Sequence, residues 1–125
     1  MIDAQTQRWY AVHVSVVGNT DDSIVVTVRG DLDLDSSTVL STTLEQVLDR
    51  PAPRIVIDLT GVGFCDSTGL SAFAVGHNRA LAGGGWLRLA GPSEFLGELL
   101  DTVGLTPRIP VYPTVGDALT GRDAD

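Results

Sequence analysis

Residues 54–70, with the sequence RIVIDLTGVGFCDSTGL, decide the fold of this chain. Residues 54–59 indicate a strand, and its continuous apolar run at residues 55–57 predicts a central strand covered on both faces of a sheet. A connection with glycines at positions 61 and 63 follows. The polar run Asp66-Ser67-Thr68 then opens a helical pattern, so a small hydroxyl residue lies where a strand is followed by a helix.

The start of that helix is a favourable place for a phosphate. The first backbone N–H groups of a helix have no partner within it, and the helix dipole is positive there. Such a site can hold a phosphate that is bound as an anion or attached to a hydroxyl. The local pattern leaves two compatible interpretations of Ser67: an N-cap that bonds an amide, or a phosphate acceptor.

The first half of the chain predicts a hairpin and a helix. Alternating Val12, Val14 and Val16 indicate a strand, residues 18–22 a turn and residues 24–28 a second, antiparallel strand. Asp35, Ser36 or Ser37 can cap the next helix, which the prolines in residues 51–53 end. The apolar stripe predicted for this helix is Leu40, Leu44, Val47 and Leu48.

The second half predicts three helices and two strands. A helix runs from about Ser67 to the glycines at 83–85, and a strand follows at residues 86–90. A helix then starts at residues 91–93, a short edge strand lies within residues 107–111, and a last helix surrounds residues 115–119. Residues 121–125 are expected to fray. The apolar stripes are Leu70, Phe73, Ala74, His77 and Leu81, and then Phe95, Leu96, Leu99, Leu100 and Val103.

These elements predict an α/β fold. Strands that alternate with helices after an opening hairpin indicate a mixed, mostly parallel sheet of four to five strands, with about four helices. The length of 125 residues fits one domain over residues 1–125, with a core of roughly 10–120. A chain of this size forms a core without a metal or a disulfide.

Composition excludes several classes of partner. The net charge of −8 argues against nucleic acid and against anionic lipid, and favours a partner with a neutral or basic docking face. Cys65 is the only cysteine, so we expect no internal disulfide. We expect its side chain to be a small buried apolar group. Residues 1–9 show no signal-peptide pattern, and no apolar stretch approaches the roughly 20 residues of a membrane helix. We expect a cytoplasmic protein.

Two other chemistries are weighed and rejected. Asp31, Asp33 and Asp35 resemble the start of a calcium loop, but Ser36 and Thr42 stand where that loop needs glycine and glutamate. Without a metal, two interpretations of these carboxylates stay open: the water-facing end of a strand, or a contact of Asp33 with a partner. The glycine runs lack the endings of phosphate-binding and dinucleotide-binding loops, so we expect no cofactor.

Ser67 is not expected to be a hydrolytic nucleophile. Cys65 stands where a nucleophile elbow needs glycine. The nearest histidine along the helix, His77, lies roughly 15 Å away by helix rise. It also falls on the apolar stripe, where a packed histidine is expected. The chain is therefore predicted not to be an enzyme.

The motif Asp66-Ser67-Thr68-Gly69-Leu70 resembles the signature of the STAS domain family, and within it the anti-anti-sigma factors (anti-sigma factor antagonists). In that family the motif reads Asp-Ser-Ser/Thr-Gly-Leu. Residues 30–33 are similar to the family's Gly-Glu-Leu-Asp element. Residues 58–64 and the pattern between residues 99 and 119 agree as well, so the resemblance covers roughly residues 10–120.

The resemblance implies a role for each matching residue. Ser67 would be phosphorylated by a partner kinase, and Asp33 would lie near it and contact the partner, together with Asp66, Thr68 and Gly69. Gly69 is expected to leave the approach to the hydroxyl open. Leu70 is expected to anchor the helix to the sheet. Thr68 and Ser71 remain open as secondary acceptors.

The resemblance also implies the partners. With Ser67 unphosphorylated, the protein would bind an anti-sigma factor that is an ATP-dependent serine kinase, and so release a sigma factor. Phosphorylation of Ser67 would inactivate it, and a metal-dependent serine phosphatase would restore it. The alternative is a STAS subunit of a transporter complex that is not phosphorylated.

Overall fold

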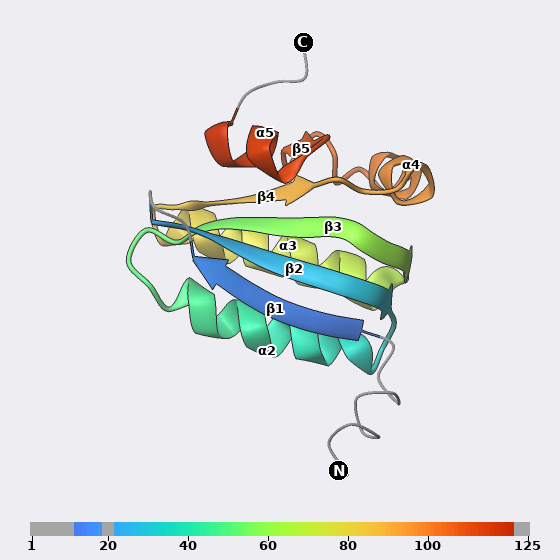
Figure 1. The fold of residues 1–125 in the computed structure, drawn as a ribbon, viewed down its shortest axis with the longest axis horizontal. Coiled ribbons are helices and arrows are strands. Elements are labelled where there is room, and N and C mark those ends of the chain that lie inside the picture. The colour runs from blue at the N-terminus through green and yellow to red at the C-terminus, as the bar shows by residue number, and fades with distance from the viewer. Residues whose placement is uncertain (1–11, 19–21, 122–125) are drawn as a thin grey trace.

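The computed structural model of the chain describes residues 12–18 and 22–121. Five strands form one sheet in the order β1-β2-β3-β4-β5, with β1 antiparallel to β2 and the other neighbours parallel (Figure 1). This confirms the predicted fold class. The strands are β1 Val12–Gly18, β2 Ser23–Leu32, β3 Arg54–Cys65, β4 Trp86–Ala90 and β5 Val111–Tyr112; the helices are α2 Ser36–Leu48, α3 Ser67–Ala82, α4 Glu94–Thr102 and α5 Val115–Thr120.

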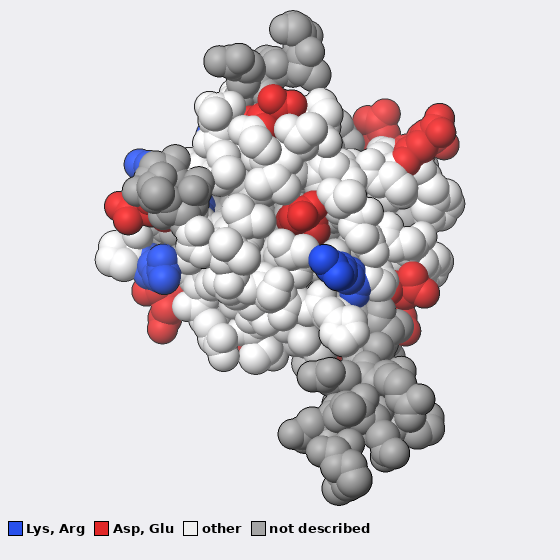
Figure 2. Space-filling model, viewed as in Figure 1, with Lys and Arg blue, Asp and Glu red and all other residues white. Residues whose placement is uncertain are grey.

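Strand β3 is covered on both faces, as predicted. Helices α2 and α3 lie against one face of the sheet, and α5 covers the other face over β3 and β4 (Figure 1). Ile55 and Ile57 enter the main core, whereas Val56 packs in a smaller cluster with Ala90, Tyr112 and Ala118. The face of β1 and β2 that no helix covers carries few charged side chains (Figure 2); one of them is the exposed Arg29 of β2, which is paired with His13 of β1.

Strands β2 and β3 are longer than predicted. The sequence predicts strands at residues 24–28 and 54–59, with a connection at residues 60–65. In the structure residues 61–65 stay paired with Arg29–Leu32 through two register shifts. These shifts are β-bulges, which let the two strands stay paired although extra residues interrupt the register. The alternation of residues along one strand does not reveal such pairing. The carboxyl ends of these two parallel strands therefore place Asp33 and Asp66 at the same end of the sheet.

Asp33 caps helix α2. Asp35 precedes the helix but makes no side-chain cap hydrogen bond. Instead, the Ser36 N–H donates to Asp33 Oδ1 at 3.0 Å, and the Asp33 N–H donates to Ser36 Oγ at 2.8 Å. This reciprocal pair has the pattern of a capping box. Of the predicted candidates, Asp35 holds the N-cap position without a side-chain bond and Ser36 takes part in the cap, whereas the capping role of Asp33 was not predicted.

The helix faces agree with the prediction only in part. The bounds of α3 and α5 agree closely, but Leu81, Phe95 and Val103 are exposed rather than packed. Close contact of α3 is instead made by its small residues, and the nine-residue helix α4 buries only Leu96 and Leu100. The edge strand β5 overlaps the predicted range 107–111 only at Val111, because it is limited to two residues by the prolines at 110 and 113.

Some predictions fall on parts of the chain that the structure does not describe. Three sets of predictions lie outside the described residues: residues 1–9, residues 19–21 of the predicted turn, and residues 122–125 of the frayed end.

Gly121 ends α5 in the left-handed region, with φ of 71°. Among the described helices, none combines the length and apolar character needed to cross a bilayer.

Candidate functional site

Asp66 caps helix α3. Its Oδ1 accepts hydrogen bonds from the N–H of Thr68 at 2.9 Å and of Gly69 at 3.3 Å, and also from the Thr68 hydroxyl. The Asp66 N–H donates to Leu32 O at 2.9 Å, which fixes the helix start to the end of β2. The orphan amides at the start of the helix are thus bonded by Asp66, and the N-cap interpretation of Ser67 is wrong.

Ser67 is the first residue of α3, and its side chain is exposed. The side-chain hydrogen bonds described at this turn are made by Asp66 and Thr68, and Ser67 takes part in none of them. The hydroxyl therefore faces solvent with no role in capping. An outside enzyme can reach it without unfolding the helix.

Thr68 is held in a different way from its neighbour. Its hydroxyl donates to Asp66 and lies 3.1 Å from Ser37 Oγ, and Ser37 is buried near the start of α2. Thr68 thus connects the starts of α2 and α3. Among the three hydroxyl residues considered as acceptors, Ser67 and Ser71 are exposed and Thr68 is half-buried.

Two carboxylates give this end of the molecule a negative charge. Hydrogen bonds from the backbone and side chain of Ser36 lower the pKa of Asp33. The hydrogen bond from the Thr68 side chain, and then those from the backbone of Gly69 and Thr68, lower the pKa of Asp66. The negative charge of Asp33 raises the pKa of Asp66, because the two carboxylates repel each other. Both are ionised at neutral pH.

Cys65 is the small buried residue that the sequence predicts. It is 2% exposed, and burial, followed by the nearby charge of Asp66, raises the pKa of its thiol to about 12. The thiolate needed for nucleophilic chemistry is therefore absent at neutral pH.

Gly69 serves packing rather than access to the serine. It is buried, and a Cβ at this position would lie 2.6 Å from Cys65 Sγ and 3.0 Å from Leu32 Cβ. The expectation that Gly69 leaves the approach to Ser67 open is replaced by this contact. Leu70 is partly buried against the main core, as expected for an anchor.

Gly69→Ala is expected to destabilise the fold by about 1–3 kcal/mol, because overpacking displaces Cys65 or Leu32. Gly97→Ala is the matched control, since a Cβ on this other helical glycine meets nothing within 4 Å. The control is expected to be neutral or stabilising, because alanine is the better helix former. Urea unfolding measures both; equal stabilities would contradict the packing role.

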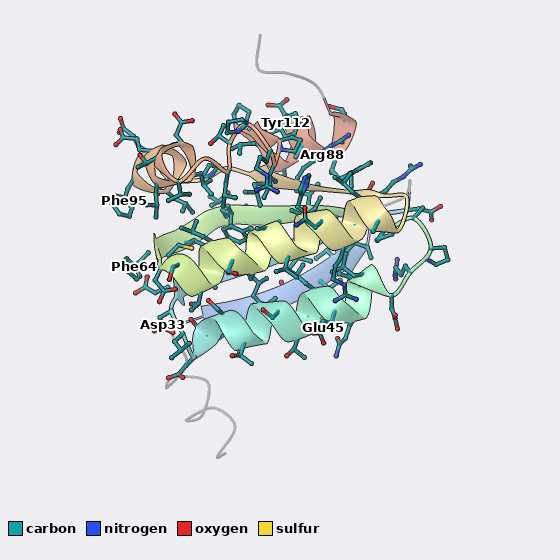
Figure 3. The ribbon with its side chains drawn as sticks, turned by 180° about the vertical axis from the view of Figure 1, so that it is seen from behind. Asp33, Glu45, Phe64, Arg88, Phe95 and Tyr112 are labelled. Atoms are coloured by element: carbon teal, nitrogen blue, oxygen red, sulfur yellow. The ribbon has the colours of Figure 1, made fainter. Side chains whose placement is uncertain are left out.

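Three exposed apolar side chains lie around the N-terminal end of α3, which we call its mouth, and we name the three residues the apolar rim. They are Leu34, Phe64 and Phe95, exposed by 70%, 46% and 57%. Figure 3 shows Phe64, Phe95 and Asp33 at the end of the molecule where α3 begins. Sequence reasoning missed the rim. For Phe64 a signal was present, because the side chain next to a buried strand residue, here Cys65, points the other way.

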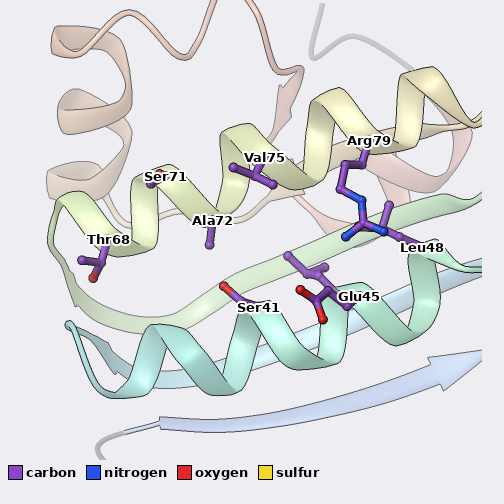
Figure 4. Close-up of a pocket in the computed structure, with 9 residues that line it drawn as sticks. Ser41, Glu45, Leu48, Thr68, Ser71, Ala72, Val75 and Arg79 are labelled. Carbon is purple, nitrogen blue, oxygen red and sulfur yellow. The ribbon is translucent and has the colours of Figure 1, made fainter.

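A groove between α2 and α3 continues from this end of the molecule (Figure 4). Its volume is about 280 Å³, its floor is apolar, and Thr68 and Ser71 lie at the end nearest Ser67. Glu45 and Arg79 come from its two opposite helices. The lining residues are Ser41, Leu44, Glu45, Leu48, Thr68, Ser71, Ala72, Val75 and Arg79.

The remaining candidates lie away from the mouth of α3 or are occupied by packing. His77 is buried ten residues along α3, and its Nδ1 has no hydrogen-bond partner among the described residues, so it is packed but not fully satisfied. His13 and Asp31 are exposed, on β1 and β2. The described residues contain no group of three or more side chains that could hold a metal ion.

Comparison with solved structures finds the same fold in anti-sigma factor antagonists. An antagonist from Mycobacterium paratuberculosis is 29% identical, with a TM-score of 0.78 over 88% of this chain and 92% of that one. SpoIIAA in its unphosphorylated form is 19% identical, with a TM-score of 0.74 over 87% and 95%. Bacillus SpoIIAA in the phosphorylated form is also 19% identical, with a TM-score of 0.69 over 87% and 98%.

A transporter domain has this fold as well. The murine anion transporter Slc26a9 is 15% identical, with a TM-score of 0.74 over 96% of this chain but only 24% of the transporter. The family model described as "Mlab, STAS domain" matches residues 15–110, which is most of the chain. The protein therefore belongs to the STAS domain family, as the motif at the start of α3 indicates.

Proposed function

We propose that this protein is an anti-sigma factor antagonist, a binding module switched by phosphorylation of Ser67. In the unphosphorylated form it binds an anti-sigma factor serine kinase in the cytoplasm, and a sigma factor is released. The observation that carries the proposal is the exposed Ser67 hydroxyl at the first position of α3, where capping does not use it.

The chemistry belongs to the partner. The kinase supplies ATP, Mg²⁺ and the base that takes the proton from Ser67 Oγ. The Oγ–phosphorus bond forms as the bond between the γ-phosphorus and the bridging oxygen breaks, and ADP leaves. This chain contributes an accessible hydroxyl on a rigid helix and no cofactor. A serine phosphatase hydrolyses the phosphoester and restores the binding form.

The phosphate separates the partners by charge and occlusion. It adds about −1.5 to −2 charge beside the ionised Asp66 and Asp33. Enclosing three negative groups in an interface is costly unless cations match them. At a helix start the phosphate is tolerated, so the fold is expected to stay unchanged. The similarity of this fold to both forms of SpoIIAA supports a switch without refolding.

The apolar rim supplies the docking contacts. Large apolar side chains exposed together around a functional residue are typical of interaction sites, and aromatic residues often dominate binding energy there. Phe64 and Phe95 lie at the end of the molecule where the Ser67 helix begins. A partner that packs on them covers the serine, so docking and phosphorylation use the same surface.

Phosphosite mapping tests the proposal. Incubation with the anti-sigma factor serine kinase of the same organism and ATP is expected to add one phosphate, located on Ser67 by tandem mass spectrometry. Ser67→Ala is expected to abolish the mass increase, whereas Ser71→Ala, which removes another exposed hydroxyl on the same helix, keeps it. A phosphate found only on Thr68 or Ser71 contradicts the assignment.

Phe95→Ala is expected to weaken binding of the kinase at least tenfold, because an interface aromatic is removed. Leu81→Ala is the matched control. Leu81 is 55% exposed against 57% for Phe95, but it lies fourteen residues along α3, roughly 21 Å from Ser67 by helix rise. Titration calorimetry measures both variants. An equal loss in the two would place the docking surface elsewhere.

A second candidate is a STAS subunit of a transporter complex. It is favoured by the fold similarity to the Slc26a9 anion transporter. In that case Ser67 receives no phosphate from any kinase of the organism, and affinity capture recovers transporter subunits in place of a sigma-factor regulator.

A further inference from the structure

The two edges of the sheet are protected very differently. Strand β5 has two residues, with Pro110 and Pro113 on either side, and short strands and prolines are common ways to block edge pairing. Strand β1 has seven residues and contains no proline and no Asp, Glu, Lys or Arg. It pairs with β2 along its whole length, and no described strand pairs with its other side.

The open edge of β1 is uncharged: Val14 and Val16 lie on the face covered by α2, and Val17 lies with His13 and Ser15 on the opposite face. Val16, on the face covered by α2, is 46% exposed, and Val17, on the opposite face, is 55% exposed. The sheet face seen in Figure 2 has few charged side chains. A long, uncharged edge strand is a template on which another strand can form backbone hydrogen bonds.

The flank of helix α2 beside β1 is uncharged as well. Because Ser41, Glu45 and Leu48 face α3 across the groove, helical geometry places Val39 and Thr43 on the opposite flank, toward the edge of the sheet. In a chain with a net charge of −8, copies repel each other over most of the surface. This uncharged strip is where two copies can approach closely.

We propose that two copies of this protein associate through antiparallel pairing of their β1 edges, about a two-fold axis at Ser15. This register places Ser15 opposite Ser15 of the second copy, Val14 opposite its Val16, and His13 opposite its Val17. Residues directly opposite in an antiparallel pair lie on one face, so the valines that face α2 meet each other. Helix α2 lies over β1 and β2 and comes alongside its copy.

The geometry closes at two copies and leaves the phosphorylation site open. Since β5 is blocked, the sheet cannot continue from its other edge, and a two-fold contact is used up by one partner. Val12 pairs with Gly30, near the end of β2 that binds Asp66. In the antiparallel arrangement the two Ser67 ends therefore point in opposite directions, and the inference stands apart from the proposed function.

Sedimentation equilibrium over a concentration series tests the pairing. The wild type is expected to show a monomer–dimer equilibrium, and Ser15→Lys is expected to be monomeric, because it sets two lysines against each other at the axis. Thr27→Lys is the control, since Thr27 is paired with Ser15 but lies one strand further from the edge. Circular dichroism checks that all three are folded. A wild type that is monomeric throughout, or a dimer that persists in Ser15→Lys, overturns the proposal.

A charge swap tests the register itself. Ser15→Lys and Ser15→Glu are each expected to be monomeric, and an equimolar mixture is expected to form a heterodimer at least as tight as the wild-type dimer. Only an arrangement that sets position 15 against itself restores association in this way. A mixture that stays monomeric overturns the two-fold axis at Ser15.

Discussion

Ser67→Asp is expected to bind the anti-sigma factor kinase about a hundredfold more weakly than the wild type, which corresponds to about 2.7 kcal/mol. The substitution places a third carboxylate beside Asp33 and Asp66, at the surface that the partner covers. A charge enclosed without a matching cation is costly. Ser67→Ala is expected to bind as the wild type does, because the Ser67 hydroxyl makes none of the described side-chain hydrogen bonds at this turn.

The control for this prediction adds the same charge elsewhere. Thr42 is exposed in the middle of α2, away from the mouth of α3, so Thr42→Asp changes the net charge equally. It is expected to keep the wild-type affinity in calorimetric titration. If Ser67→Asp binds as tightly as Ser67→Ala, charge at this position is not what separates the partners.

Gly85→Ala is expected to cost about 3 kcal/mol or more in stability, at the upper end for overpacking. A Cβ at this position would lie 1.7 Å from Pro53 O and 2.5 Å from Pro53 C. Backbone atoms cannot move aside as a flexible side chain can. The approach also aligns β3 with β4, because the Trp86 N–H donates to Pro53 O at 2.8 Å.

Urea unfolding of Gly85→Ala against the wild type and Gly97→Ala measures this effect. Gly97→Ala introduces the same methyl group into open space and is expected to change stability by less than about 1 kcal/mol. A fully stable Gly85→Ala would mean that the turn between α3 and β4 adjusts to the methyl group, and that the close approach to Pro53 is not required.

Elements governed by local periodicity could be predicted from the sequence. The apolar run at residues 55–57 predicted a doubly covered strand, and the alternation at residues 12–16 predicted half of a hairpin; both are confirmed. The extension of β3 to Cys65 could not be predicted, because its bulged pairing with β2 depends on tertiary contacts. Phe95 was misplaced because a short helix leaves open which apolar residues face the sheet.

The position of the candidate site followed from the motif, but its internal roles did not. Asp66, Ser67 and Thr68 are all good capping residues, so only the geometry shows that Asp66 caps and that Ser67 is left exposed. The capping role of Asp33 depends on Ser36, three residues later. The packing role of Gly69 depends on Cys65 and Leu32, and Leu32 belongs to another strand.

The central claim is that a phosphate on the Ser67 oxygen decides whether the partner binds. The most direct measurement is calorimetric titration of the kinase with two preparations of this protein, unphosphorylated and singly phosphorylated at Ser67. The account predicts that phosphorylation weakens binding by about a thousandfold, which is about 4 kcal/mol, with an unchanged circular dichroism spectrum. Equal affinities for the two preparations would contradict it.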